Sequence, residues 1–160
     1  MANNDNSKIL IDTNILFNDF LFRHSKYGNT ELNRELSNRK TANDAMTFIR
    51  QRRYFKTYVA DFSLVKLVSL MDKVKVPKDL SIIEIELVLS KNCVVPMSSK
   101  LFAKSINDFK TKKDVKDIED AFQFTLSQAY KCSFILTLNG KDFKFFDTRV
   151  IHPKNIRSII

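Results

Sequence analysis

The stretch that decides the fold is KILIDTN, residues 8–14, in which the apolar run Ile9–Ile11 ends abruptly at Asp12, Thr13 and Asn14. A short apolar run bounded by polar residues predicts a buried strand whose C-terminal end presents hydrogen-bonding groups. A carboxylate at the end of a buried strand needs a partner or a metal ion, because burial removes its hydration. Asp12 is therefore the first candidate functional residue.

Apolar runs farther along the chain alternate with stretches of helical spacing. The further predicted strands are 57–60, 93–95, 133–138 and 148–151. The predicted helices are 15–22, one that begins at Thr41 or Asn43 and ends near 53, then 61–71, 79–90, 98–109 and 117–130, and residues 23–40 are predicted to be a polar connection. This alternation is typical of a parallel sheet covered by helices on both faces. Since 160 residues fit one domain, we expect a single α/β domain spanning residues 1–160.

The composition narrows the chemistry that this domain can perform. With 27 basic and 18 acidic side chains, the formal net charge is +9, which favours a polyanionic partner, nucleic acid first and an acidic protein second. The chain has only two glycines, so it lacks the Gly-rich loops of Walker-A and dinucleotide sites. Its two histidines and two cysteines stand far apart, without zinc-ligand spacing. Any hydrolytic chemistry must therefore rest on carboxylates.

The expected location follows from what the sequence lacks. No run approaches the length of about 18 apolar residues that a membrane helix needs. The N-terminal residues 1–7 are polar and lack the apolar region of a signal peptide. We therefore expect a cytoplasmic protein with no membrane partner.

Further polar residues follow or precede the other predicted elements at the same edge of the sheet, where active sites of open parallel sheets form. Asn139 follows the fourth strand and Asp142 comes three residues later, while Asp117, Glu119 and Asp120 begin a helix. The helix dipole alone favours acids at such a helix start, but Asp117 and Asp120 also share one helix face. Several acids without a nearby histidine favour Mg²⁺ or Mn²⁺, which activates water and neutralises charge on a phosphate. An acidic notch on a basic protein is the layout expected of a nuclease.

Four segments together resemble a PIN domain over about residues 8–155: ILIDTNILFNDFL (9–21), YVADFSLVKLVSL (58–70), DIEDAFQFTLSQAYKCSFILTLNGKDF (117–143) and VIHP (150–153). The third segment is the most specific, because an acid pair, a helix, an apolar strand and a T-x-N-x-x-D-F ending occur together. The resemblance implies a three-layer α/β/α PIN-like fold with a central parallel sheet. It also implies a Mg²⁺- or Mn²⁺-dependent endoribonuclease, a homodimer and, as in toxins of VapC type, an antitoxin protein that holds the enzyme inactive.

The resemblance also assigns roles to single residues. Asp12 matches the first acid of the family, a metal ligand, and Asp120 matches the acid of the late helix. The remaining assignments are Glu119 and Asp117 as further metal ligands, Asn139 and Asp142 as catalytic residues that orient groups around the metal, and Thr13, Asn14 and Thr137 as supporting residues.

One position departs from the family pattern. Lys66 stands where the second acid of the family usually lies, and Ala60 stands where a serine is expected. A cation there either repels a metal ion or replaces its charge, and some branches of the family carry Asn at this place. Two hypotheses therefore stay open: a metal-dependent endoribonuclease that is the toxin of a toxin–antitoxin pair, or a catalytically degenerate PIN domain that binds RNA or a protein.

Two basic clusters are candidate contacts for the RNA backbone. Arg50, Arg52 and Arg53 end a predicted helix, where the helix dipole also favours cations without any function. The second cluster, Lys110, Lys112 and Lys113, lies in a basic connector, and such a charge run is most often a solvated loop.

Overall fold

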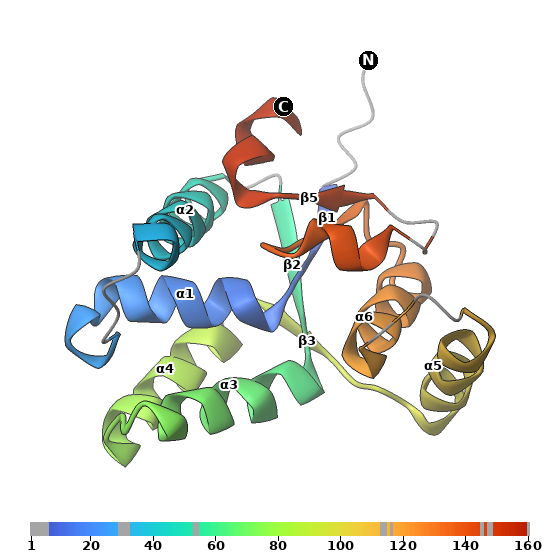
Figure 1. The fold of residues 1–160 in the computed structure, drawn as a ribbon, viewed down its shortest axis with the longest axis horizontal. Coiled ribbons are helices and arrows are strands. Elements are labelled where there is room, and N and C mark those ends of the chain that lie inside the picture. The colour runs from blue at the N-terminus through green and yellow to red at the C-terminus, as the bar shows by residue number, and fades with distance from the viewer. Residues whose placement is uncertain are drawn as a thin grey trace.

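The computed structural model describes residues 7–28, 33–52, 55–112, 115, 117–144, 146 and 149–159. Within these residues the strands form one five-stranded parallel sheet in the order β3-β2-β1-β4-β5. The strands are β1 (Ser7–Ile11), β2 (Phe55–Ala60), β3 (Cys93–Val95), β4 (Phe134–Leu136) and β5 (Val150–Ile151). Helices flank the sheet, so the fold is the predicted three-layer α/β/α arrangement with a central parallel sheet (Figure 1).

Six α-helices and three short 3-10 helices cover the sheet in the described part of the chain. The α-helices are α1 (Thr13–Arg23), α2 (Asn33–Arg50), α3 (Asp61–Lys73), α4 (Lys78–Lys91), α5 (Ser99–Thr111) and α6 (Ile118–Ala129). The 3-10 helices are η1 (Ser25–Tyr27), η2 (Gly140–Phe143) and η3 (Pro153–Ile159). None of the described helices combines the length and the apolar character that crossing a membrane requires.

The two faces of the sheet pack against different helices, because successive side chains of a strand point to opposite faces. On one face Ile9 and Ile11 of β1 join an apolar cluster with residues of α1 to α4 and η3. On the other face Leu10 joins a smaller cluster with residues of α5, α6 and η2. All three residues are fully buried, so β1 lies at the centre of both cores.

This topology places the proposed functional residues at one edge of the sheet. Since the strands are parallel, their carboxyl ends meet there, and α1 and α3 begin directly after β1 and β2. The backbone N–H of Asp12 continues the ladder by donating to the carbonyl oxygen of Leu136 at 3.1 Å. Asp12 therefore ends β1 beside the end of β4.

The prediction for the second helix was wrong. Residues 33–40 belong to α2, although they were predicted to be part of a polar connection that ended before Thr41 or Asn43. The first turns of α2 are largely exposed and carry no apolar face that a periodicity could reveal. One side chain in this part is an exception: Arg39 is buried and donates from Nη1 to the carbonyl oxygen of Gly28 at 2.7 Å. At the other end of the chain, Thr148 of the predicted last strand lies outside the described residues.

Candidate functional site

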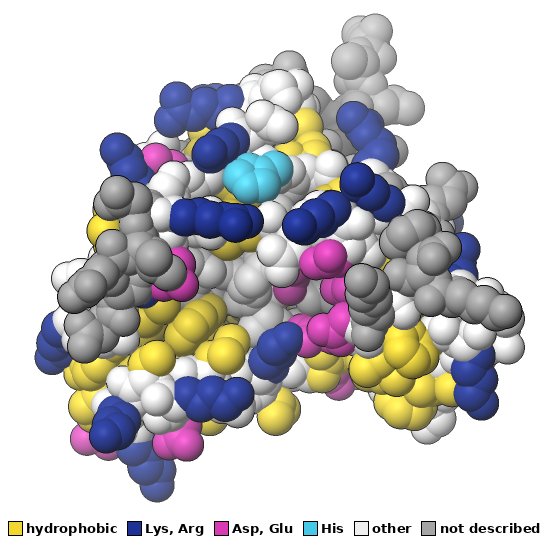
Figure 2. All heavy atoms as spheres, viewed as in Figure 1, with side chains coloured by type: hydrophobic (Ala, Val, Ile, Leu, Met, Phe, Trp, Pro, Cys, Tyr) yellow, Lys and Arg dark blue, Asp and Glu magenta, His cyan; other side chains and the backbone are white. Residues whose placement is uncertain are grey.

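A hollow of about 870 Å³ opens at the carboxyl edge of the sheet, between α1, α3, α6 and η2. Its polar lining consists of the carboxylates Asp12, Asp117, Glu119, Asp120 and Asp142, the amides Asn14, Asn18 and Asn139, and the lysines Lys66, Lys141 and Lys144. Figure 2 shows acidic side chains gathered near the middle of this face, with basic side chains on either side of them. The structure thus brings together all the acids that the sequence singled out.

Asp12 is held by three side-chain donors at the bottom of this site. Its Oδ2 accepts hydrogen bonds from Thr137 Oγ1 and Asn14 Nδ2, each at 2.6 Å, and its Oδ1 accepts one from Gln123 Nε2 at 3.0 Å. Only 8% of the residue is exposed. Burial, which outweighs the stabilising bond from Thr137, raises the pKa of Asp12 from 3.8 to about 6.

Asn14 and Thr137 join the ends of the two central strands. Asn14 Nδ2 also approaches Thr137 Oγ1 at 3.0 Å, and Asn14 Oδ1 accepts a hydrogen bond from the backbone N–H of Leu138 at 3.2 Å. The hydroxyl of Thr137 in turn accepts from the backbone N–H of Asn139 at 3.0 Å. The predicted supporting residues Asn14 and Thr137 therefore fix the loop that presents Asn139.

Asp120 lies across the hollow at the start of α6. It has no hydrogen-bond partner among the described residues, unlike Asp12. Partial burial, followed by the negative charges of Asp117 and Asp142 and then those of Asp12 and Glu119, raises the pKa of Asp120 from 3.8 to about 7. Two acids with raised pKa values in one hollow indicate a candidate functional site, because burying acids beside like charges works against folding.

Glu119 is engaged by a cation and a hydroxyl. Its Oε2 is bonded to the ammonium of Lys66, which comes from α3, and its Oε1 accepts from Thr13 Oγ1 at 3.3 Å. Although burial opposes the charge of Lys66, the hydrogen bond and charge of Glu119 raise the pKa of that lysine. The departure from the family pattern is thus an ion pair inside the acidic hollow.

The remaining acids of the site have simpler surroundings. Asp117 caps α6, since its Oδ1 accepts from the backbone N–H of Glu119 at 2.9 Å. Capping is a sufficient structural reason for an acid at this place. Asp142 belongs to η2, whose turn is closed by a 2.9 Å bond from its backbone N–H to the carbonyl oxygen of Asn139.

The oxygen donors of the hollow are of the type that a hard divalent cation prefers, but among the described residues they do not form a three-acid site. All the candidate ligands are carboxylate or amide oxygens, which Mg²⁺ and Mn²⁺ prefer. Among the described residues, no three Asp, Glu, His or Cys side chains stand close enough to bind one ion together. In chemical type, Asp12, Asp120 and Asp142 are suited to hold such an ion, and Glu119 is already paired with Lys66.

Sequence reasoning missed four polar residues of the site, the first of them Asn18 of α1, whose side-chain amide donates to the backbone carbonyl oxygen of Asn14 at 2.7 Å. Gln123 is 1% exposed and donates to Asp12, and it lies one helical turn after Asp120 on α6. That spacing on an otherwise apolar helix face was the available signal. Lys141 and Lys144 line the hollow beside Asp142, within and directly after η2. They gave no signal, because a short 3-10 helix has no sequence pattern of its own.

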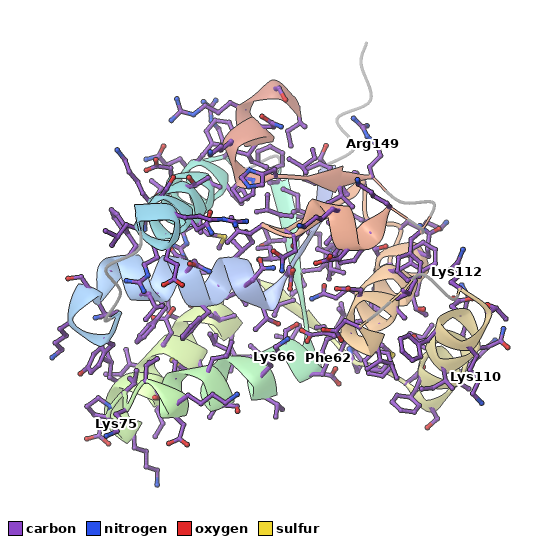
Figure 3. All side chains as sticks on the ribbon, in the orientation of Figure 1. Phe62, Lys66, Lys75, Lys110, Lys112 and Arg149 are labelled. Carbon is purple, nitrogen blue, oxygen red and sulfur yellow. The ribbon has the colours of Figure 1, made fainter. Side chains whose placement is uncertain are left out.

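The predicted basic clusters lie elsewhere. Arg50 is bound to Asp19 at 2.8 Å, and the guanidinium of Arg52 lies over the ring of Phe48 at 4.8 Å. Both arginines line a separate hollow between α2 and β2. Figure 3 shows Lys110 and Lys112 near α5, at the end of the molecule beyond α6. Arg53 and Lys113 lie outside the described residues. Of the predicted RNA contacts that the structure describes, none lines the acidic hollow.

Comparison with solved structures identifies the fold. The chain is similar to a toxin–antitoxin complex from Klebsiella pneumoniae at 18% identity, with a TM-score of 0.60 over 91% of this chain and 97% of that chain. It is similar to VapBC2 from Rickettsia felis bound to a promoter DNA fragment at 13% identity, with a TM-score of 0.64 over 91% and 98%. It is also similar to VapC20 from Mycobacterium tuberculosis, described as a toxin that cleaves the sarcin–ricin loop, at 12% identity, with a TM-score of 0.59 over 79% and 86%.

No family model and no curated protein matches the chain by sequence. The structural similarity nevertheless spans nearly the whole chain and nearly the whole of these toxin-type chains. The chain therefore has the PIN-domain fold of VapC type, as the four quoted segments predicted.

Proposed function

We propose that the chain is a divalent-metal-dependent endoribonuclease and the toxin of a toxin–antitoxin pair. The observation that carries the proposal is the convergence of Asp12, Asp120 and Asp142 on one hollow at the carboxyl edge of the sheet. The PIN fold of VapC type supports it, and one protein of this fold is described as an RNA-cleaving toxin.

The chemistry assigns a role to each group. Asp12 and Asp120 would hold Mg²⁺ or Mn²⁺, which when bound supplies an activated water and neutralises charge on the phosphate, and Asp142 would orient groups around the ion. Thr137, Asn14 and Gln123 fix the rotamer of Asp12 and favour its charged form by donating to it. Asn139 presents an amide at the rim, where it would orient water or a phosphate oxygen.

The RNA would approach this hollow past cations. Lys141 and Lys144 line the same hollow as the acids, so their ammonium groups can meet the phosphates next to the cleaved bond. The net charge of +9 would draw a polyanion to the protein while the metal screens the acids. A cytoplasmic location, as the sequence predicts, would place the enzyme with its substrate.

The proposed protein partners are an antitoxin and a second copy of this chain. Solved structures of this fold include toxin–antitoxin complexes, two of them bound to DNA. The exposed side chains of Val65 and Phe102 line one apolar hollow together with Phe62, Met97 and Phe122. A contiguous apolar surface of this kind supports a protein interface. Co-expression with a neighbouring gene product, followed by light scattering of the purified species, tests both partners.

The alternative is a PIN domain without activity that binds RNA or a protein. The Lys66–Glu119 ion pair favours it, because a cation occupies the place of an acid. Mn²⁺ calorimetry and cleavage of labelled single-stranded RNA distinguish the two functions. Metal binding with metal-dependent cleavage supports the nuclease. RNA binding without metal binding or cleavage supports the alternative.

A further inference from the structure

Lys66 is a cation that enters the acidic hollow from α3. Figure 3 labels it on that helix, and its ammonium is bonded to Oε2 of Glu119 in the first turn of α6. The side chain of Lys66 is 45% exposed. An ammonium has three N–H donors, and among the described residues only Glu119 accepts from this one. Lys66 therefore keeps donors for a ligand that enters the hollow.

Glu119 holds this ammonium in place. Its other oxygen, Oε1, accepts a hydrogen bond from Oγ1 of Thr13 at 3.3 Å, and Thr13 is a buried residue in the first turn of α1. The carboxylate is thus fixed from the core side. A free lysine side chain loses rotamer entropy when it binds a ligand, and a lysine already held by a carboxylate has lost part of that entropy beforehand. Thr13 and Glu119 therefore pre-organise Lys66.

Two further lysines line the hollow from a different element. Lys141 lies in η2 and Lys144 directly follows it, whereas Lys66 belongs to α3. Figure 2 shows the acidic side chains near the middle of this face, with basic side chains on either side of them. A phosphate over the acids needs a metal ion between them, but the phosphates before and after it in the same strand would meet lysines. The layout therefore suits a strand of successive phosphates.

From this arrangement we infer that Lys66 is a phosphate-binding residue and that the RNA strand crosses the hollow from α3 to η2. One phosphate meets the ammonium of Lys66, which Glu119 positions. A phosphate on the other side of the cleaved bond meets Lys141 and Lys144. The inference rests on the RNA substrate of the proposed function, and it gives a role to the cation that stands in place of an acid.

The test is RNA binding by the full chain carrying Asp12→Asn, in Mg²⁺ buffer, measured as the fluorescence anisotropy of a labelled single-stranded RNA at several salt concentrations. Lys66→Gln should weaken binding at least about fivefold, and the negative slope of the logarithm of the binding constant against that of the salt concentration should become shallower by about 0.7. Lys66→Arg, which keeps a cation, should bind like the parent. The matched control Lys73→Gln changes an exposed lysine of the same helix that does not line the hollow, and it should alter binding by less than about twofold.

Combining substitutions from α3 and η2 tests the path of the strand. The triple variant Lys66→Gln, Lys141→Gln, Lys144→Gln should change the salt slope by the sum of the changes in Lys66→Gln and in the double variant of η2, because the two sides contact different phosphates. Thermal unfolding shows whether each variant is folded. A folded triple variant that binds RNA as well as the double variant would overturn a strand that runs from α3 to η2.

Glu119→Gln tests the positioning of Lys66. Because this substitution removes the ion pair, Lys66→Gln should weaken binding less in the Glu119→Gln background than in the parent. A larger loss in that background would mean that Glu119 only neutralises the lysine, which would overturn the positioning. If Lys66→Gln bound like the parent while the double variant of η2 bound weakly, the inference would fail and the RNA substrate would stand. A parent that binds no RNA would overturn both.

Discussion

The hydroxyl of Thr137 donates a 2.6 Å hydrogen bond to Oδ2 of Asp12, although the two residues are 125 positions apart in the sequence. Thr137 is fully buried directly after β4, and Asp12 ends β1. The parallel pairing of these two strands brings their ends together. The most buried acid of the site is therefore positioned by the fold itself.

Replacing Thr137 tests this positioning. In Thr137→Val the side chain keeps its shape, but Asp12 loses its short donor, so its carboxylate is less stabilised and its pKa rises further. A hydrogen bond to a charged group contributes about 1.5–3 kcal/mol, so the acidic limb of the pH–rate profile should move up by about one pH unit or more. Thr137→Ser, which keeps the hydroxyl, should leave the profile close to wild type. Identical profiles for all three proteins would contradict the role of this bond.

The raised pKa values of the site acids predict how stability changes with pH. A carboxyl whose pKa is higher in the folded chain than in the unfolded one makes the fold less stable as it ionises. For Asp12 the rise from 3.8 to about 6 corresponds to about 3 kcal/mol. The metal-free protein should therefore lose stability as the pH rises from about 4 to about 7. The upper end of this range is set by Asp120, whose pKa is raised to about 7.

Denaturant unfolding at a series of pH values checks this. Asp12→Asn should be more stable than wild type at pH 8 without metal, by about 1–3 kcal/mol, and nearly equal to it at pH 4. Bound Mn²⁺ should reduce the difference at pH 8, because the ion stabilises the ionised form of Asp12. If Asp12→Asn were less stable than the wild type at pH 8, the ionised carboxylate of Asp12 would not destabilise the metal-free fold, which would contradict this prediction.

Lys141 and Lys144 are predicted to bind RNA phosphates. The double variant Lys141→Gln, Lys144→Gln should weaken RNA binding by the Asp12→Asn protein, which cannot cleave its ligand. The logarithm of the RNA-binding constant falls linearly with the logarithm of the salt concentration. For single-stranded RNA each lost phosphate contact should make this negative slope shallower by about 0.7. The matched control is Lys73→Gln, Lys75→Gln, since Lys73 ends α3 and Lys75, labelled in Figure 3, follows it two residues later. Fluorescence anisotropy that shows equal losses for both pairs would point to unspecific charge attraction.

A buried ion-pair cluster away from the site is predicted to stabilise the fold. Arg23 contacts Glu84 of α4 through two bonds of 3.0 and 2.5 Å, and it also pairs with Asp19 at 3.3 Å. Glu84→Gln removes one charge of this cluster and should lower the free energy of unfolding by about 2–3 kcal/mol, with unchanged cleavage per folded molecule. Glu86→Gln, at an exposed position of the same helix, should change it by less than about 0.5 kcal/mol. Equal denaturation midpoints would contradict a stabilising role.

The sequence predicted the central sheet because its strands carry strong local signals. The run Ile9–Ile11 and its abrupt polar end are visible without any knowledge of the partners, and so is the capped start of α6. The beginning of α2 at Asn33 was not predictable in this way, since its first turns depend on propensity and on the contact between Arg39 and Gly28. A contact between residues 11 positions apart leaves no periodic pattern.

The site was predictable in its acids and not in its surroundings. Asp12 and Asp120 follow from strand ends and helix starts, which a parallel sheet gathers at one edge. The partner of Lys66 was not predictable, because the ion pair with Glu119 depends on how α3 approaches α6. The same holds for Gln123, whose amide is indistinguishable from any polar residue on a helix until the fold places it against Asp12.

Cleavage of end-labelled single-stranded RNA tests the central claim most directly. The wild type is compared with the double variant Asp12→Asn, Asp120→Asn, each with Mn²⁺, with Mg²⁺ and with EDTA. The account predicts cleavage by the wild type with either ion, none with EDTA, and none by the double variant, which should remain folded. Cleavage that persists in EDTA or in the double variant would contradict a metal-dependent nuclease site at Asp12 and Asp120, as would a wild type that neither binds Mn²⁺ nor cuts RNA.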